Sequence, residues 1–161
     1  MTPIRERTVV LLKPDALQRN LLGKIIERFE QKGLKVAGLK MMQLEDVLLD
    51  EHYGHHKEKP FFQGLKDFMK SAPIVAMVLE GLEAVKVVRT LCGPTLGREA
   101  QPGTIRGDFS MSVQANIVHS SDSVETAEIE IARFFNEDEL FEYDKIDLEQ
   151  VYVEDEREGK R

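Results

Sequence analysis

The sequence predicts an α/β fold in which helices cover a single β-sheet. Short apolar or β-branched runs alternate with segments whose apolar residues recur at helical spacing, in the order β-α-β-αα-β-α-loop-β-α. No internal repeat, low-complexity block or interdomain linker interrupts this order. Two β-α-β halves predict a ferredoxin-like sandwich, in which helices cover a four-stranded, mainly antiparallel sheet.

The first half of the chain is expected to hold two strands and three helices. Residues 7–12 form a β-type run, and Lys13-Pro14-Asp15 ends it. Apolar residues then recur at helical spacing between 22 and 29, and Gly33 is placed to cap that helix. Residues 35–44 are the second strand candidate. Two short helices follow, over residues 45–55 and 60–70.

In the second half, a strand, a helix and a long loop precede the last strand and helix. Residues 74–79 form a continuous apolar run of strand length, and a helix is expected over 82–91. Residues 93–107 carry no periodicity, and long loops of this kind are commonly functional. Asp122 and Glu125 resemble a capping pair at the start of the last helix. The last strand and helix are expected over residues 110–118 and 124–135.

Length and composition predict one domain over residues 1–161, with an irregular, frayed acidic tail over about 137–161. The formal net charge of −7 disfavours strong nucleic-acid binding, because phosphate neutralisation needs a basic face. No apolar run approaches the roughly 20 residues of a membrane span, and the first residues have no signal-peptide core. The single cysteine, Cys92, excludes an intrachain disulfide and suits a cytoplasmic protein.

His119 is the first candidate for chemistry, because it stands where the last expected strand meets the last helix. A neutral imidazole is a competent nucleophile near neutral pH, but it needs a partner that fixes its tautomer. Glu130 lies about two helical turns beyond Ser123 on the same face, and Ser121 could bridge the two side chains. The alternative is a polar turn with an incidental histidine and an exposed helix carboxylate.

Basic side chains supply candidate anion sites. Arg106 has glycines close by on both sides, so the backbone can fold around it and present its guanidinium fork to phosphate. Arg89 near a helix end and Thr95 in the long loop are further candidates. Lys13 follows the first strand, at the edge where ligands of α/β sheets bind. Each of these could equally be an ordinary surface residue.

A histidine cluster offers a different function. His52, His55 and His56 recur at helical spacing and could bind zinc, although no cysteine lies nearby. Phe61 and Phe62 fit either the core or a platform on which a base stacks.

Several of these residues belong to motifs whose order and spacing match one known family from Thr8 to about Phe135. The motifs are Lys13-Pro-Asp, Tyr53-Gly-His-His56, Pro60-Phe-Phe62, Arg89, Thr95, Pro102-Gly-Thr-Ile-Arg106-Gly-Asp-Phe and Asn116-Ile-Val-His119-Ser-Ser121-Asp. With them, the chain resembles the nucleoside diphosphate kinases along nearly its whole length. The Gly-Thr-Ile-Arg-Gly-Asp-Phe string with Asn-x-x-His close behind it is the most specific part.

The resemblance implies an activity and roles for individual residues. This family moves the terminal phosphate of a nucleoside triphosphate, such as ATP, to a nucleoside diphosphate by a ping-pong route through a phosphohistidine. His119 would be phosphorylated, Glu130 and Ser121 would orient it, and Tyr53 would pack beside it. The implied nucleotide contacts are Lys13 and Asn116 for the ribose, Arg89, Thr95, Arg106 and His56 for the phosphates, and Phe61 and Val113 for the base.

The resemblance also implies a cofactor and an assembly. Mg²⁺ would bridge the phosphate oxygens, held mainly by the nucleotide. Stacking tolerates every base, which fits broad specificity and a role in the supply of GTP, UTP, CTP and dNTPs. A homohexamer or homotetramer in the cytoplasm is expected.

The chain departs from the family pattern in three places. Ser120 replaces the usual glycine after the histidine, and serine would cost on the order of 1 kcal/mol if this position needs a positive φ. Leu96-Gly97 replaces Asn-Pro or Asp-Pro, and the tail lacks the tryptophan often found there, so subunit contacts can differ. Ser120 leaves open a second hypothesis, a binding or regulatory protein without turnover. The third is the metal-binding module of the histidine cluster.

Overall fold

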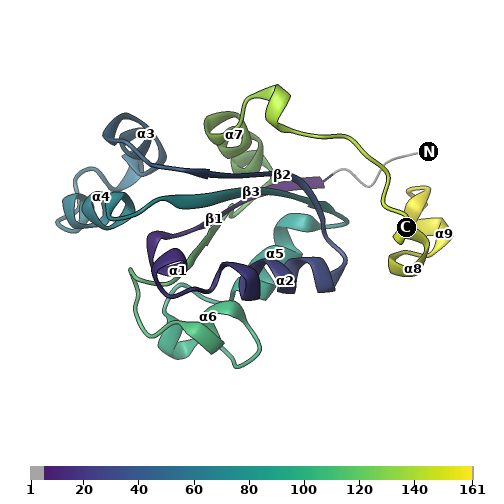
Figure 1. Cartoon of the computed structure of the whole chain (residues 1–161), viewed down its shortest axis with the longest axis horizontal. Coiled ribbons are helices and arrows are strands. Elements are labelled where there is room, and N and C mark those ends of the chain that lie inside the picture. The colour runs from purple at the N-terminus through teal and green to yellow at the C-terminus, as the bar shows by residue number, and fades with distance from the viewer. Residues whose placement is uncertain (1–5, 161) are drawn as a thin grey trace.

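The computed structural model describes residues 6–160 of the chain. Its centre is one antiparallel sheet with the strand order β2-β3-β1-β4 (Figure 1). The strands are β1 (Glu6–Leu12), β2 (Lys35–Met42), β3 (Ile74–Gly81) and β4 (Val118–Ser120). The predicted four-stranded, antiparallel sheet with covering helices is therefore confirmed.

Helices cover both faces of this sheet (Figure 1). Helices α2, α5 and α6 contribute to the core on one face, and α3, α4 and α7 to the core on the other. The helices of the main body are α1 (Pro14–Gln18), α2 (Leu22–Lys32), α3 (Asp46–His52), α4 (Phe62–Lys70), α5 (Ala84–Cys92), α6 (Ile105–Phe109) and α7 (Val124–Phe134). Single 3₁₀ turns add η1 (Gly54–His56), η2 (Gly97–Glu99) and η3 (Glu137–Glu139), and the tail holds α8 (Leu148–Val151) and α9 (Glu154–Arg157). None of the helices in residues 6–160 combines the length and the apolar character that crossing a bilayer requires.

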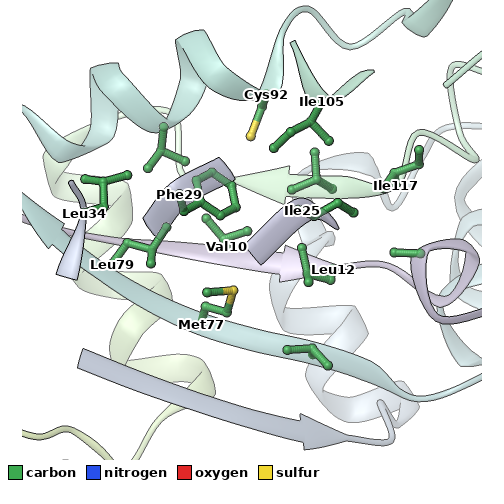
Figure 2. Packing of buried hydrophobic residues seen from close by; sticks show 14 of the residues in the cluster. Val10, Leu12, Ile25, Phe29, Leu34, Met77, Leu79, Cys92, Ile105 and Ile117 are labelled. Carbon is green, nitrogen blue, oxygen red and sulfur yellow. The ribbon is translucent and has the colours of Figure 1, made fainter. Parts of the chain in front are cut away.

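Alternate residues of the central strands enter two separate hydrophobic cores. On one face, Val10 and Leu12 of β1 pack with Ile25 and Phe29 of α2 (Figure 2). On the other face, Val9 and Leu11 join the side chains of α3, α4 and α7. Because both faces are covered, every residue of β3 is buried, and its residues 74–79 are all apolar.

The last strand is shorter than the sequence predicts. β4 spans only Val118–Ser120, whereas residues 110–117 form an irregular loop. In this loop, Ser112 Oγ accepts hydrogen bonds from the N–H groups of Gln114 at 3.2 Å and Ala115 at 3.1 Å. Local bonds of this kind compete with strand pairing. The expected strand over 110–118 is thus wrong up to residue 117.

Two helix starts also differ from the expectation. The aperiodic segment 93–107 contains η2 and the start of α6, which Thr104 caps by accepting from the N–H of Gly107 at 2.9 Å. At α7, the cap is Ser123, whose Oγ accepts from the N–H of Thr126 at 3.0 Å. The expected cap at Asp122 is therefore one residue too early. By contrast, Gly33 ends α2 with a φ of 100°, as predicted.

The acidic tail packs against the sheet over part of its length and carries the short helices α8 and α9. The N–H of Phe141 donates to the carbonyl of Ala37 on β2 at 2.8 Å. Further along, the hydroxyl of Tyr152 accepts from the N–H of Leu82 at 3.2 Å. Figure 1 shows this segment running from α7 past the β2 edge to α8 and α9.

Candidate active site

β4 and α7 bring His119 and Glu130 together. β4 pairs with β1 so that His119 lies opposite Leu11, and Glu130 lies two turns into α7. His119 Nε2 and Glu130 Oε2 are 2.6 Å apart. The His119 side chain is 24% exposed and that of Glu130 only 2%, so the ring reaches solvent while the carboxylate does not. Because an ionised carboxylate only accepts, the ring proton lies on Nε2, and Nδ1 keeps its lone pair.

The negative charge of Glu130 is stabilised from several sides. Burial alone would raise the pKa of this carboxyl, but His119, His52 and Ser121 together hold the pKa below its usual value. The Ser121 hydroxyl contributes to this effect although its geometry falls short of a full hydrogen bond. A carboxylate that stays charged keeps the His119 proton on Nε2.

His52 lies directly behind His119. The two ring centroids are 4.7 Å apart at an interplanar angle of 85°, and His52 Nδ1 lies 3.3 Å from Glu130 Oε2. Arg133 Nη1 is 2.9 Å from the same His52 nitrogen. Burial lowers the pKa of His52 to about 3, and the charge of Glu130 opposes this shift only in part, so this imidazole is neutral. Tyr53 packs edge-on against His52 at 4.6 Å, and burial raises the pKa of its hydroxyl.

Lys13 and Asn116 form a second buried pair. Lys13 Nζ donates to Asn116 Oδ1 at 2.7 Å, and Asn116 Nδ2 donates to the carbonyls of Thr95 at 2.9 Å and Val113 at 3.0 Å. Burial, together with the charge of Arg106, lowers the pKa of Lys13 to about 8. Asn116 therefore links Lys13, just after β1, to the loop that holds Thr95 and to its own loop at Val113.

Arg106 organises the backbone around this pair. Its guanidinium donates to the carbonyls of Gly93 at 2.6 Å, Asn116 at 3.3 Å and Val118 at 2.5 Å. Burial lowers the pKa of Arg106, and the nearby charge of Arg89 adds to this effect. A guanidinium has more N–H groups than these three, so some remain for an anion. Arg106, predicted to bind phosphate, thus also stabilises the backbone around it.

Arg89 is exposed and lies at the rim of a cavity. The cavity has a volume of about 720 Å³, and its lining includes Arg89, Thr104 and the Asp122-Ser123 turn that follows His119. Thr95 is also exposed, and its carbonyl receives the Asn116 amide. These residues face solvent close to the buried cations, where an anionic ligand could reach them.

Phe61 and Val113 are exposed apolar residues, at 48% and 59% of their surface. Phe61 lies outside the core, which removes the alternative that it is a core residue, whereas Phe62 packs against the core. The ring of His56 lies 5.1 Å from that of Phe61, and burial lowers the pKa of His56. His56 and Phe61 form a surface pair on the chain between α3 and α4.

Ser120 does not impose the strain that its glycine replacement could have caused. It lies within β4, and it is not among the described residues with a positive φ. Its hydroxyl lies beside the buried thiol of Cys92. The hypothesis of a chain without turnover loses its only motive.

The alternative of a zinc cluster formed by His52, His55 and His56 does not fit the structure. His52 turns inward to His119 and Glu130, whereas the rings of His55 and His56 pack against each other at the surface, with centroids 3.9 Å apart and planes tilted by 48°. Within residues 6–160, the side chains that could together hold a metal ion are His52, His119 and Glu130. The helical spacing was misleading because α3 ends at His52 and a 3₁₀ turn follows.

Sequence reasoning missed three residues around the site: Asp15, His52 as a partner of Glu130, and Arg133. Arg133 lies one helical turn after Glu130, and this spacing was the available signal. Asp15 stands next to Pro14 in a motif already noticed, and its Oδ2 accepts from the N–H of Ile117 at 3.0 Å. No local pattern links Asp15 to a loop that lies a hundred residues away.

Comparisons with known proteins identify the family of the chain. The family model described as nucleoside diphosphate kinase matches residues 6–140. A nucleoside diphosphate kinase from Parabacteroides distasonis is 58% identical over 151 residues, covering 94% of this chain and 99% of that protein. One from Archaeoglobus fulgidus is 51% identical over 149 residues, covering 92% and 99%.

Solved structures give the same answer. The halophilic nucleoside diphosphate kinase of Halobacterium salinarum in complex with CDP superposes with a TM-score of 0.90 at 47% identity, covering 92% of this chain and 99% of that one. A nucleoside diphosphate kinase family protein from Babesia bovis gives 0.88 at 42% identity, covering 91% and 99%.

Enzymes of this family use a divalent cation and transfer phosphate by a ping-pong reaction through a phosphohistidine. The chain belongs to the nucleoside diphosphate kinase family, and it is a phosphotransferase that acts on nucleotides.

Proposed function

We propose that His119 Nδ1 is the atom that carries the phosphoryl group. Its lone pair attacks the γ-phosphorus of a nucleoside triphosphate such as ATP. The N–P bond forms as the bond from that phosphorus to the β–γ bridging oxygen breaks, and the nucleoside diphosphate leaves with the electron pair. A second nucleoside diphosphate then takes the phosphoryl group by the reverse step. The observation that carries this proposal is the 2.6 Å contact between His119 Nε2 and the buried Glu130 carboxylate.

Glu130 contributes by holding the reactive tautomer. A proton fixed on Nε2 leaves Nδ1 free, and the carboxylate stabilises the positive charge that develops on the ring as the N–P bond forms. Ser121 favours the charged form of the Glu130 carboxylate. Tyr53 packs against His52, which in turn packs against His119. Phosphoryl transfer depends mainly on such positioning and charge stabilisation.

The nucleotide contacts are assigned by the chemistry of each side chain. Arg106, Arg89, Thr95 and His56 would bind the phosphates, and the free N–H groups of Arg106 and the exposure of Arg89 and Thr95 support this. Lys13 and Asn116 would bind the ribose hydroxyls. Phe61 and Val113 would sandwich the base, since both expose apolar surface. A base held mainly by stacking fits broad specificity and a role in supplying GTP, UTP, CTP and dNTPs.

The cation is proposed to be Mg²⁺, bound mainly by phosphate oxygens. The carboxylate of the His52-His119-Glu130 group already accepts from a ring nitrogen, which argues against a resident ion there. When bound to the nucleotide, Mg²⁺ would neutralise charge on the leaving diphosphate.

We further propose a homo-oligomer, a hexamer or a tetramer, built from one domain per chain and located in the cytoplasm. β2 is an edge strand, and its Leu39 and Met41 are 53% and 61% exposed. A second copy along this edge would cover them. The buried thiol of Cys92 suits a reducing compartment.

Labelling tests the proposed chemistry. The protein is incubated with Mg²⁺ and γ-labelled ATP, and it should take up acid-labile, base-stable label and pass it to GDP. His119→Ala should take up none. Undiminished transfer by His119→Ala would overturn the assignment.

A further inference from the structure

The backbone just before His119 adopts a strained conformation. Ile117 has a φ of 76°, and the N–H of Val118 donates to the carbonyl of Asn116 at 2.8 Å. Together these features define a γ-turn centred on Ile117. A β-branched residue with a positive φ is a genuine outlier, and such outliers persist only where the surroundings hold them. The turn separates Asn116 on one side from His119 on the other.

Two residues just after β1, Lys13 and Asp15, hold this turn. Asp15 Oδ2 accepts from the N–H of Ile117 at 3.0 Å, and the N–H of Lys13 donates to the carbonyl of Ile117 at 2.8 Å. Both backbone polar groups of Ile117 are therefore bound to residues 13–15. Asp15 is itself fixed, because it lies in the first turn of α1 and its carbonyl accepts from the N–H of Arg19 at 2.9 Å.

The same short segment also carries a nucleotide contact. Lys13 Nζ binds the side chain of Asn116, while Lys13 N–H binds the residue after it. The contacts proposed for the ribose and the histidine proposed for phosphorylation thus lie on opposite sides of one turn. Any relaxation of Ile117 to a negative φ would change the spacing between them.

We propose that Asp15 is a positioning residue, whose carboxylate holds the strained turn at Ile117 and thereby sets the position of His119 relative to the bound nucleotide. This inference rests on the proposed role of His119. Asp15 acts through the backbone and touches no reacting atom. A capping role at α1 does not explain its contact, because Oδ2 binds a backbone group from a loop a hundred residues away.

The first test removes the acceptor in two steps. Single-turnover phosphorylation by γ-labelled ATP and Mg²⁺ is measured for Asp15→Ala and Asp15→Asn at saturating ATP. Asp15→Ala should slow the step by about 10- to 100-fold, because small displacements of a reacting group have effects of this size. Asp15→Asn should recover most of the rate, because its amide oxygen can accept from the same N–H. Equal rates for wild type and Asp15→Ala would overturn the inference.

The second test separates positioning from general stability. Glycine adopts a positive φ without strain, so Ile117→Gly in the Asp15→Ala background should restore the phosphorylation rate. The same change removes a fully buried side chain, so the Tm should fall further. A rate that rises while the Tm falls is the expected signature. A rate that falls along with the Tm means that Asp15 is only structural, and the inference fails.

Two controls complete the design. Tyr152→Phe removes another side-chain acceptor of a distant N–H, far along the chain from the site, and should lower the Tm without slowing phosphorylation. If wild type takes up no label on His119, the proposed function fails. If wild type is labelled and Asp15→Ala is labelled equally fast, only the role of Asp15 fails. Should the double variant not fold by circular dichroism, the Asp15→Ala and Asp15→Asn rates decide alone.

Discussion

At the scale of single residues, the site depends on polar side chains that are buried and paired. Glu130 accepts from His119, Lys13 donates to Asn116, and Arg106 donates to three carbonyls. Each of these contacts fixes a side chain in one orientation. A buried polar group that loses its partner costs far more than the pair contributes, so single substitutions here are expected to have large effects.

Glu130→Gln should slow phosphorylation of His119 by about 10- to 100-fold, a range typical for groups that orient a functional histidine. Glutamine lacks the charge that stabilises the ring cation, and its amide can turn a donor toward Nε2. Single-turnover labelling measures the rate. Glu128→Gln, an exposed neighbour on α7, is the matched control and should leave the rate unchanged. A rate unaffected by Glu130→Gln would contradict the assigned role.

The lowered pKa of Lys13 predicts a pH dependence of nucleotide binding. Its ammonium loses its proton as the pH rises through about 8, so the KM for ADP should increase above that pH. In Lys13→Gln the KM should be high throughout, without this inflection. An inflection that persists in Lys13→Gln would assign it to another group.

The lowered pKa of Lys13 also makes the stability of the fold depend on pH. In the unfolded chain Lys13 keeps its usual pKa of 10.5, so burial of the ammonium destabilises the fold below pH 8. This cost is relieved progressively as the pH rises from about 8 to 10.5.

At the scale of elements, α7 is positioned by its start. Ser123 accepts from the N–H of Thr126, and the helix that begins there brings Glu130 to His119 of β4 and Arg133 to His52 of α3. Ser123→Ala should lower the free energy of unfolding by about 1 kcal/mol, as removal of an N-cap does. Asp122→Ala, at the position that the sequence favoured for the cap, should change it little. Urea denaturation of both variants measures the difference, and equal losses would contradict the assignment.

The elements also explain what the sequence could and could not predict. Residues 74–79 are predictable because a strand covered on both faces is apolar throughout, whereas residues 7–12 and 35–44 are predictable from their short apolar and β-branched runs between turn signals. Residues 110–117 were misread because serine side chains divert backbone groups from pairing, and an alternating pattern does not reveal this. The site residues came from motif resemblance. Asp15 and His52 needed the structure, since their partners are distant in the sequence.

At the scale of the whole molecule, β2 forms one of the two edges of the sheet. The tail covers part of β2 near Ala37, and it leaves Leu39 and Met41 exposed. Leu39→Lys with Met41→Lys should therefore reduce the molar mass in solution, as measured by light scattering after size-exclusion chromatography. Val47→Lys, at an 81% exposed position on α3, is the control and should leave the mass unchanged. An unchanged mass in the double variant would place the interface elsewhere.

The single cysteine of the chain, Cys92, can report local unfolding of the protein through its rate of alkylation. Cys92 is the last residue of α5 and is fully buried beside Ser120 of β4. Burial raises the pKa of its thiol to about 11, so a thiol reagent cannot attack it in the folded state. Alkylation of Cys92 requires that α5 and β4 separate locally. The rate of alkylation therefore reports local opening around Cys92, and no engineered probe is needed. A nucleotide that binds only the folded protein should therefore lower the alkylation rate of Cys92 as its occupancy increases.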